Sequence, residues 1–419
     1  MNKCKLRDIS VLITKGTTPT TVGGEFSNEG IKFIKSESIT GSKFLDKSLF
    51  SFISEDIDLK LKRSRIQKND LLFSIAGAYL GKIAIATEED TPANTNQAVA
   101  IVRVDSKKAD VNYLYYFFSQ KNINEYINKL SSQSSQPNLN LELLGNLEFQ
   151  NRNLVEQQKI SSVLSALDDK IELNNKINTE LELMAKTLYN YWFVQFDFPD
   201  EEGKPYKSSG GKMAYNEVLK REIPQGWEVK RLEEIENNII TGKTPSTLVK
   251  DNFGGDIPFV TIDDIRKQLF IINSDRKLSE KGAGTQKSKF LEIGDICVSC
   301  IGTVGVIGIV GKKCQTNQQI NTISKVKDYN RYFLLNALKK YFEFNVAAKQ
   351  GAVLSNMNKG EFSDIPILDC PKEIKTKFLK IVMPFYDKLN LNLQQNQELA
   401  SLRDWLLPML MNGQVKVEK

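Results

Sequence analysis

Three cysteines lie close enough together in the sequence to suggest metal or redox chemistry. Cys297 and Cys300 form a C-x-x-C pair, and Cys314 follows shortly after. Thiolates at this spacing bind zinc when two further ligands complete a tetrahedral site. The sequence has no second C-x-x-C pair and no histidine to supply those ligands. We therefore interpret these cysteines as small apolar residues of buried strands.

The absence of histidine excludes several kinds of catalytic site at once. Ser-His-Asp and Cys-His nucleophiles, histidine bases and His-ligated zinc all require this residue. The five cysteines of the 419-residue chain are scattered and odd in number, which favours a reducing cytoplasm over a disulfide framework. The first residues have no apolar signal-peptide core, and glycines interrupt the longest apolar run. We expect a soluble intracellular protein.

Two other motifs resemble catalytic signatures only in part. Gly242-Lys-Thr244 matches the end of a Walker A loop, but position 237 is Asn and Pro245 opposes the helix that must follow. The acidic residues Asp200 and Glu202 lie beside Lys204 as in some nucleases, but they are too close in sequence to converge on a metal from separate strands. A solvated turn explains them better, and we predict a chain without catalytic residues or a metal site.

Positive charge is the more informative chemistry. The sequence has 57 Lys and Arg against 51 Asp and Glu, a formal charge of +6. Basic residues gather at two places before β-like runs, and loops rich in Ser, Thr, Asn and Gln lie nearby, as in proteins that contact phosphates and base edges. Ordinary solvated surface is the alternative. The candidate DNA contacts are Thr18, Lys62, Arg63, Arg65, Thr244, Lys287 and Lys289.

The two basic clusters belong to an internal repeat. Ile13-Thr-Lys-Gly-Thr-Thr-Pro19 reappears as Ile239-Ile-Thr-Gly-Lys-Thr-Pro245 at an offset of 226 residues, and Thr95-Asn-Gln97 reappears as Thr316-Asn-Gln318. From Leu139 onwards the offset is 218 residues and holds without gaps to Leu406. The chain is therefore two copies of one unit, each with a globular part followed by a helical part.

The globular parts are predicted to be mixed. Short β-like runs such as Leu71–Ile75 and Val99–Val104 are bounded by Gly, Asn and Asp turn residues. One helix follows in each copy, near 112–130 and 330–348. The fold class we predict is α+β, with two similar globular domains separated by two long antiparallel coiled-coil helices.

The helical parts carry a heptad pattern over about four repeats, which is typical of paired helices. A companion row is predicted at Val163, Lys170, Ile177, Met184 and Tyr191. In the second copy, Pro384 predicts a helix that begins after it or is kinked there. The proposed seam residues are Leu167, Asn174, Leu181 and Leu188 in the first helix, and Leu389, Asn392, Leu399 and Leu406 in the second.

These patterns predict five segments. Residues 1–152 form the first globular domain and 153–195 the first long helix. Residues 196–226, rich in Pro, Gly and Ser, form a linker that lets the helices run antiparallel. Residues 227–371 form the second globular domain, and 372–419 form the second helix and a tail.

The sequence resembles the specificity subunits of type I restriction–modification systems over essentially its whole length. The resemblance is carried by Glu156-Gln-Gln-Lys-Ile160, Leu188-Tyr-Asn-Tyr-Trp-Phe193, the stretch from Phe198-Pro to Gly203-Lys-Pro-Tyr-Lys-Ser-Ser-Gly-Gly211, and Ile223-Pro-Gln-Gly-Trp227. The second helix departs from the pattern, because it opens with Cys370-Pro-Lys-Glu-Ile-Lys and lacks the Glu-Gln-Gln string.

This resemblance implies a non-catalytic subunit that binds double-stranded DNA. Each of its two target recognition domains would recognise one half of a bipartite site, and the spacer helices would fix the gap and bind two modification subunits. Those partners would bring S-adenosylmethionine and methylate adenine. Restriction subunits would add ATP- and Mg-dependent translocation and cleavage, so no cofactor is expected in this chain.

Two other classes remain open at the level of sequence. One is a DNA-modifying enzyme whose motif is unfamiliar, which would bind a cofactor on its own. The other is a coiled-coil scaffold whose globular parts bind proteins, which would show no salt-dependent affinity for duplex DNA.

Overall fold

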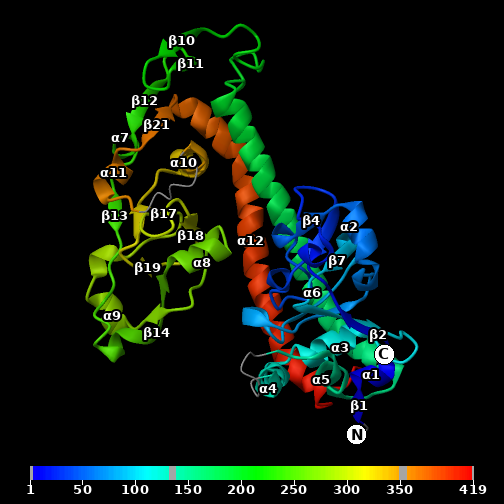
Figure 1. Ribbon diagram of the computed structural model, residues 1–419. Helices are drawn as coiled ribbons and strands as arrows, with labels where there is room; N and C mark the ends of the chain where they lie inside the picture. Colours follow the sequence, from blue (N-terminus) through cyan, green and yellow to red (C-terminus); the bar gives the residue numbers. More distant parts are fainter. Residues whose placement is uncertain (1–2, 132–137, 349–355, 418–419) are drawn as a thin grey trace. The chain divides into compact units, whose positions relative to one another are not determined.

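The computed structural model describes residues 3–131, 138–348 and 356–417. The chain divides into two compact units, which we call the first unit (1–173 with 396–419) and the second unit (174–395). Each unit combines small sheets with short helices and with part of two long helices (Figure 1). The predicted α+β class is therefore confirmed.

Three sheets build the globular part of the first unit. An antiparallel sheet has the order β2-β8-β5-β6, a second sheet has the order β4-β3-β7 with β3 and β7 parallel, and β1 pairs with β9. Every residue of β5 is buried, which explains its continuous apolar run. The strands are β1 (Lys3–Lys5), β2 (Ser10–Lys15), β3 (Ile31–Ile34), β4 (Ser51–Ile53), β5 (Leu71–Ser74), β6 (Ile83–Ile85), β7 (Ala93–Thr95), β8 (Val99–Val104) and β9 (Glu148–Gln150).

The second unit repeats this plan. Its sheets have the orders β13-β20-β17-β18-β15, β16-β14-β19 and β12-β21, with β14 and β19 parallel, and a hairpin β10-β11 precedes them. The strands are β10 (Met213–Asn216), β11 (Arg221–Pro224), β12 (Glu228–Arg231), β13 (Ile239–Thr241), β14 (Phe253–Val260), β15 (Phe270–Ile271), β16 (Lys277–Leu278), β17 (Ile296–Ser299), β18 (Ile307–Val310), β19 (Gln315–Thr316), β20 (Ile320–Ile323) and β21 (Pro366–Asp369).

Short helices cover the sheets and connect the strands. Those in the first unit are α1 (Leu6–Ile9), α2 (Glu55–Lys60), α3 (Val111–Phe118), α4 (Lys121–Ser131) and α5 (Leu141–Gly145). Those in the second are α7 (Leu232–Ile235), α8 (Ile262–Lys267), α9 (Glu280–Gly284), α10 (Asp328–Ala348) and α11 (Lys359–Ser363). The 3-10 turns used below are η1 (Pro19–Val22), η4 (Lys62–Ser64) and η9 (Lys287–Lys289).

Two long helices run through the molecule. The first, α6, spans Leu154–Tyr189 and ends in a π-helical turn at Asn190–Val194, and the second, α12, spans Lys372–Met411. The prediction that α12 begins after Pro384 is wrong, because the helix starts twelve residues earlier and continues through the proline. Its orange N-terminal part bends in Figure 1, as expected where proline removes a backbone donor.

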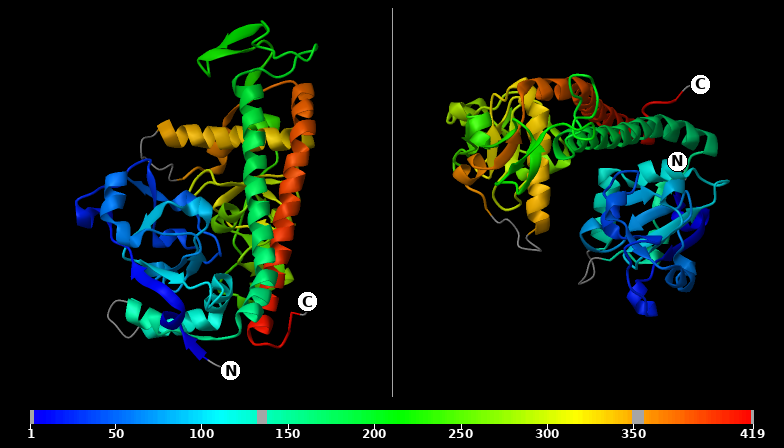
Figure 2. Two further views of the ribbon diagram at one scale, coloured as in Figure 1. Left: turned by 90° about the vertical axis from the view of Figure 1, so that its right-hand side faces the viewer. Right: turned by 90° about the horizontal axis from the view of Figure 1, so that it is seen from above.

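The long helices pair in antiparallel fashion within each unit (Figures 1 and 2). In the second unit, Asn392 Nδ2 donates to Asn178 Oδ1 (2.8 Å) and Asn174 Nδ2 donates to Gln395 Oε1 (3.3 Å). In the first unit, Arg403 contacts Asp168 on the facing helix (2.6 Å). Residue numbers rise along α6 as they fall along α12, which is the antiparallel arrangement that the repeat predicted.

Two of the predicted seam residues, Asn174 and Asn392, contact the facing helix and are buried. Leu389 is also buried but is equivalent to Ile171 and so lies outside this row, and Leu167, Leu181, Leu188, Leu399 and Leu406 are partly buried. The predicted companion row is wrong, because Lys170, Met184 and Tyr191 are exposed. The row that alternates with the first is Gln157, Leu164, Ile171, Asn178 and Ala185, and its equivalents in α12 are Lys375, Val382, Leu389, Asn396 and Arg403.

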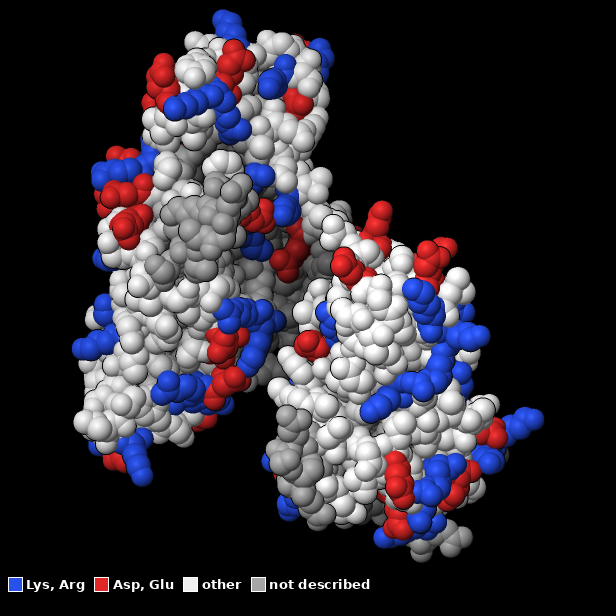
Figure 3. Space-filling model, in the orientation of Figure 1, with Lys and Arg blue, Asp and Glu red and all other residues white. Residues whose placement is uncertain are grey.

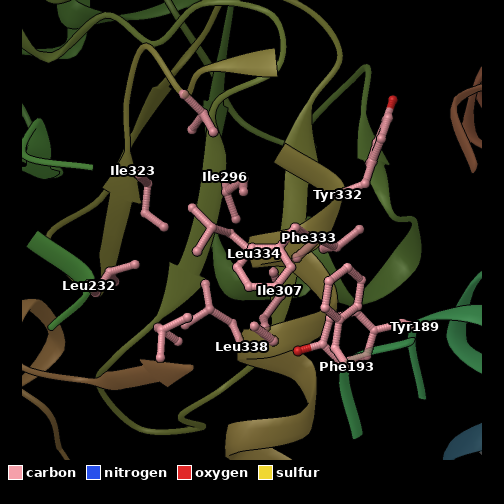
Figure 4. Packing of buried hydrophobic residues seen from close by; sticks show 14 of the residues in the cluster. Tyr189, Phe193, Leu232, Ile296, Ile307, Ile323, Tyr332, Phe333, Leu334 and Leu338 are labelled. Atoms are coloured by element: carbon pink, nitrogen blue, oxygen red, sulfur yellow. The ribbon is translucent and has the colours of Figure 1, made fainter. Parts of the chain in front are cut away.

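The core of the second unit extends from its sheet onto the end of α6. Figure 4 shows Phe333, Leu334 and Leu338 of α10 packed beside Ile296 and Ile307 of the sheet, with Tyr189 and Phe193 alongside. The ring centroids of Phe193 and Phe333 lie 5.0 Å apart in a T-shaped contact. The residues after α6 are thereby fixed to the globular part.

The segment predicted as a linker contains ordered structure in its own right. Phe198 stacks on Tyr206 (4.7 Å between centroids) and on Trp227 (5.1 Å), and β10 and β11 form a hairpin. Stacked aromatic side chains bury large apolar area, so this connection packs as part of the second unit.

Candidate nucleic-acid interface

The same loop arrangement occurs in both units. In the first unit the loop after β2 binds the end of β7, with Thr17 N donating to Thr95 O (3.1 Å). A Cβ on Gly16 would lie 1.9 Å from that same carbonyl oxygen, so only glycine fits. In the second unit Lys243 N donates to Thr316 O (2.9 Å), and a Cβ on Gly242 would lie 2.1 Å from the carbonyl of Asn317.

The predicted contacts Thr18 and Thr244 lie in these loops and make equivalent side-chain hydrogen bonds. Thr18 Oγ1 donates to Gln97 Oε1, and Thr244 Oγ1 donates to Gln318 Oε1 (2.6 Å). We call each arrangement a Thr–Gln turn: Thr18 with residues 95–98 in the first unit, and Thr244 with residues 316–319 in the second. In the sequence both glutamines stand out only as equivalent positions of the repeat, and they were not predicted as site residues.

The predicted lysines Lys62 and Lys287 occupy equivalent 3-10 turns, η4 and η9. Both are exposed, and neither makes an ion pair within the part of the chain that the structure describes. The turn η4 packs beside β2 and β7, the strands that lead into the first Thr–Gln turn. In the second unit Gln286, next to η9, donates to the carbonyl of Lys243 (2.7 Å). The exposed lysine and the Thr–Gln turn are therefore neighbours in each unit.

The remaining basic candidates have different surroundings. Arg63 is exposed and Lys289 is half-buried. Arg65 Nε donates to Asp58 (2.8 Å), whose other carboxylate oxygen accepts from buried Asn94 (3.1 Å). Arg65 thus satisfies a buried carboxylate, and its charge is partly neutralised, which makes it a weaker candidate for a phosphate contact than Lys62 or Arg63.

The charged surface differs between the units on the face drawn in Figure 3. Lys and Arg side chains form a band across the first unit, in the region between α2 and β2 of Figure 1. On the second unit, basic and acidic side chains alternate on this face. A basic band without interspersed acids is the surface expected to attract the phosphate backbone.

The three clustered cysteines, Cys297, Cys300 and Cys314, are buried, as predicted. Cys297 and Cys314 are fully buried in one apolar cluster, and Cys300 lies in another. Burial raises the pKa of Cys297 to about 12 and that of Cys300 to about 11, so both remain protonated thiols at neutral pH. Among the described residues there is no group of three or more His, Cys, Asp and Glu that could hold a metal.

The other two catalytic-looking motifs form turns. The backbone N–H groups of Gly242 and Lys243 already donate to carbonyls within the sheet, so they cannot cradle a phosphate. Asp200 Oδ1 accepts from the backbone of Glu202 (2.9 Å) and of Lys204 (2.8 Å) in an exposed turn. Both motifs therefore have a structural role.

The globular part of the first unit meets the long helices at a buried ion pair. Arg403 Nη1 donates to Asp168 Oδ1 (2.6 Å), and the phenol of Tyr116 donates to Asp168 Oδ2 (2.6 Å). Burial, together with Asp168, raises the pKa of Tyr116, so its hydroxyl stays protonated. Burial opposes the charge of Arg403, but hydrogen bonds to Asp168 and Asp404 raise its pKa above the usual value.

The second unit has its own buried ion pair where its globular part meets the long helices. Lys375 Nζ donates to Asp369 (2.6 Å) and to Asn330 (2.9 Å). Burial by itself would raise the pKa of Asp369, but hydrogen bonds from Lys375 and Lys230 outweigh it and hold the pKa below its usual range. Both junctions are fixed by hydrogen-bonded charges, which keeps each globular part in register with its helices.

No helix among the described residues combines the length and apolar character needed to cross a membrane.

Comparison with known proteins assigns this arrangement to one class. Residues 1–183 and 224–401 match the family described as the type I restriction modification DNA specificity domain. The chain is 29% identical to the type I restriction enzyme HindI specificity subunit of Haemophilus influenzae, over 92% of this chain and 94% of the relative. It is also 29% identical to the MjaIX specificity subunit of Methanocaldococcus jannaschii, over 99% and 93% of the two chains.

The fold agrees with a solved relative. The crystal structure of the type I restriction–modification S subunit from M. genitalium is similar over 98% of this chain and 95% of that chain, with a TM-score of 0.57 at 17% identity. The chain belongs to the type I DNA specificity family, as its sequence motifs indicated. It is a DNA specificity subunit, which has no catalytic role of its own in such complexes.

Proposed function

We propose that each unit of this chain binds one half of a split duplex target, and that the Thr–Gln turns with Lys62 and Lys287 face the DNA. The observation that carries the proposal is the repetition of one polar loop arrangement, beside an exposed lysine, at equivalent places in both units. Exposed cations would contact phosphates, while amide and hydroxyl groups of the loops would contact bases. Arg63 and Lys289 belong to the same proposed surface, and Arg65 would contribute mainly to its structure.

The seam residues named from the sequence would act indirectly. Asn174 and Asn392 bond to the neighbouring helix, and the role of the seam would be to hold the two helices at a fixed spacing and thereby set the gap between half-sites. Two modification subunits would bind the outer faces of the helices, where Met184 and Trp405 expose 50% and 58% of their surface. Aromatic and Met side chains are enriched in such interfaces.

The cofactors would reside in the partners. Modification subunits would supply S-adenosylmethionine for adenine methylation, and restriction subunits would supply ATP- and Mg-dependent cleavage. Since the target and these partners would share one compartment, we propose that the complex works in the cytoplasm.

The test uses two glycine variants in the complex with the cognate modification subunit. Methylome sequencing of cells that express the wild-type complex should reveal two unlike half-sites around a fixed gap. Gly16→Ala displaces only the first loop and should abolish or relax one half-site, whereas Gly242→Ala should affect only the other. Gly284→Ala is the control, because a Cβ there meets only the end of the Lys287 side chain at 4.0 Å. A wild-type motif without two halves would contradict the proposal.

A further inference from the structure

The two Thr–Gln turns agree in detail although their surroundings have diverged. Gln97 and Gln318 are both exposed, each follows an Asn that accepts a hydrogen bond from the backbone two residues later (3.1 Å in both), and each accepts from a threonine hydroxyl. Next to them, however, Ala98 is replaced by Gln319. An exposed hydrogen bond contributes only about 1 kcal/mol to stability, so folding alone gives little reason to keep the pair twice.

Each turn is anchored from two sides. In the first unit Thr17 N donates to Thr95 O on one side, and Ile75 N donates to Ala98 O (2.8 Å) on the other. In the second unit the loop after β13 binds Thr316 O, and Cys300 N donates to Gln319 O (2.7 Å). The backbone under each glutamine is therefore fixed to two segments of its unit, and the threonine restrains the side chain above it.

The hydrogen bond from the threonine leaves most of the donor and acceptor groups of the glutamine amide available to a ligand. Oε1 accepts from the hydroxyl, and within the described part of the chain no other hydrogen bond is seen for the amides of Gln97 and Gln318, both of which are exposed, so a second lone pair and both Nε2 hydrogens remain for a ligand. A glutamine amide with one donor and one acceptor side by side matches the N7 and N6 groups of adenine in the major groove. A side chain already held in place loses less entropy on binding, which favours recognition.

We propose that Gln97 and Gln318 each recognise an adenine base, one in each half of the DNA target, and that Thr18 and Thr244 position them. This rests on the proposed function, because it requires both units to bind DNA. The neighbouring residues would then distinguish the two halves. The second unit adds Lys243 where the first has Thr17, and Gln319, whose Oε1 accepts from Asn317 (2.9 Å), where the first has Ala98.

The experiment compares full complexes with the cognate modification subunit that carry Gln97→Ala, Gln318→Ala or the control Gln67→Ala, an exposed glutamine outside the turns. The wild-type methylome first defines the split motif, and duplexes with single base changes then report affinity. Gln97→Ala should make one adenine position in one half degenerate and lower affinity for the cognate duplex about tenfold to a hundredfold, with an unchanged salt slope. Gln318→Ala should do the same in the other half.

Other outcomes separate the possible failures. Equal weakening on all duplexes with a reduced salt slope would make the glutamines phosphate contacts and overturn the proposal, as would unchanged motifs or the loss of a position that requires another base. A wild-type complex without a split motif would instead refute the proposed function. Thr18→Val, which removes the hydroxyl, should relax the same position as Gln97→Ala but less strongly, and Thr18→Ser should restore it. Identical behaviour of Val and Ser would exclude the positioning role.

Discussion

The junctions between the globular parts and the long helices use opposite chemistry at equivalent positions. In the first unit Asp168 binds Arg403 and the phenol of Tyr116. The position equivalent to Asp168 in the second unit is Tyr386, which stacks on Tyr332 (4.0 Å between centroids) and accepts from Asn336 (3.0 Å). The residue equivalent to Arg403 is Ala185. At this position the first junction buries a carboxylate paired with an arginine, and the second buries a tyrosine, while its nearest ion pair, Lys339 with Glu182, is partly exposed.

About three turns nearer the start of each long helix, the relation is reversed. The second unit has the ion pair of Lys375 and Asp369, while the equivalent residues of the first unit are Gln157 and Asn151. Gln157 Oε1 accepts from the backbone of Asp110 (2.9 Å), and its Nε2 donates to the carbonyl of Arg152 (2.8 Å). The two junctions therefore bury a charged pair at different levels, Asp168 with Arg403 in one and Asp369 with Lys375 in the other. The position of the buried charge can thus make each globular part specific for its own stretch of the long helices. If a globular part packed on the other stretch, a buried charge would have no partner.

Breaking the ionic junction of the first unit should give the largest effect. Arg403→Met leaves the carboxylate of Asp168, 6% exposed, with only the phenol of Tyr116 as a partner. We expect the first unit to lose about 3 kcal/mol of stability. Hydrogen exchange of peptides from α3 and the first half of α6 should report this loss.

Two further variants test the cause. Asp404→Asn removes the exposed partner of Arg403 and should change stability by less than about 0.5 kcal/mol. Combining Arg403→Met with Asp168→Asn should recover much of the loss, because no buried charge then remains. Equal losses in Arg403→Met and in Asp404→Asn would show that the buried pair has no special role.

The corresponding change in the second unit should have a smaller effect. Lys375→Met removes a lysine that is 5% exposed, but Asp369 keeps its ion pair with Lys230 (3.0 Å). We expect a loss of about 2 kcal/mol, seen by fluorescence of the buried Trp192 and Trp227 during denaturant unfolding. Lys377→Met, at an exposed position of the same helix, is the control. Lys375→Gln with Asp369→Asn copies the first unit and should be milder than Lys375→Met alone. If this double variant were less stable than Lys375→Met, the two junction chemistries would not be interchangeable.

The smallest effect is a dependence on pH at the second junction. The pKa of Asp369 is lowered in the folded state, so its contribution to stability is complete above the unfolded value near 3.9 and is lost as pH falls through the lower folded value. The free energy of unfolding, measured by tryptophan fluorescence between pH 2 and pH 5, should fall more steeply with decreasing pH in wild type than in Asp369→Asn. Parallel curves would mean that the junction does not favour the charged form of Asp369.

The sequence predicted the parts of the fold that depend on repetition and periodicity. The offset between copies identified equivalent loops, and the heptad pattern identified Asn174 and Asn392 as members of the helix interface. The alternating seam row was missed because polar residues such as Gln157 and Asn178 occupy it, and a pattern of apolar residues cannot detect them. Of the two expectations for Pro384, a helix start after it was wrong, because tertiary packing sustains a helix that local propensity would end, whereas a kink agrees with the bend of α12.

The candidate interface was harder to predict from the sequence than the fold was. The threonines were found because glycine and proline flank them in both copies, but their partners Gln97 and Gln318 lie more than 70 residues away along the chain. The pairing of Arg65 with Asp58 needs the fold as well, since burial of the carboxylate decides which arginine is neutralised. The repeated Thr-Asn-Gln string was a signal for the glutamines, because it occurs in both copies. In the structure its first residue is buried and its third, the glutamine, is exposed.

The first unit is assembled from both ends of the chain, and this has a consequence for synthesis on the ribosome. Leu410 and Met411 complete the apolar cluster that contains Ile160 and Leu164, and Arg152 donates to the carbonyl of Met411 (2.8 Å). All residues of the second unit are translated before these last contacts become available. The nascent first unit therefore remains incomplete, with part of α6 uncovered, until residues 396–411 have been translated. Premature termination would spare the second unit and leave the first exposed to chaperones and proteases.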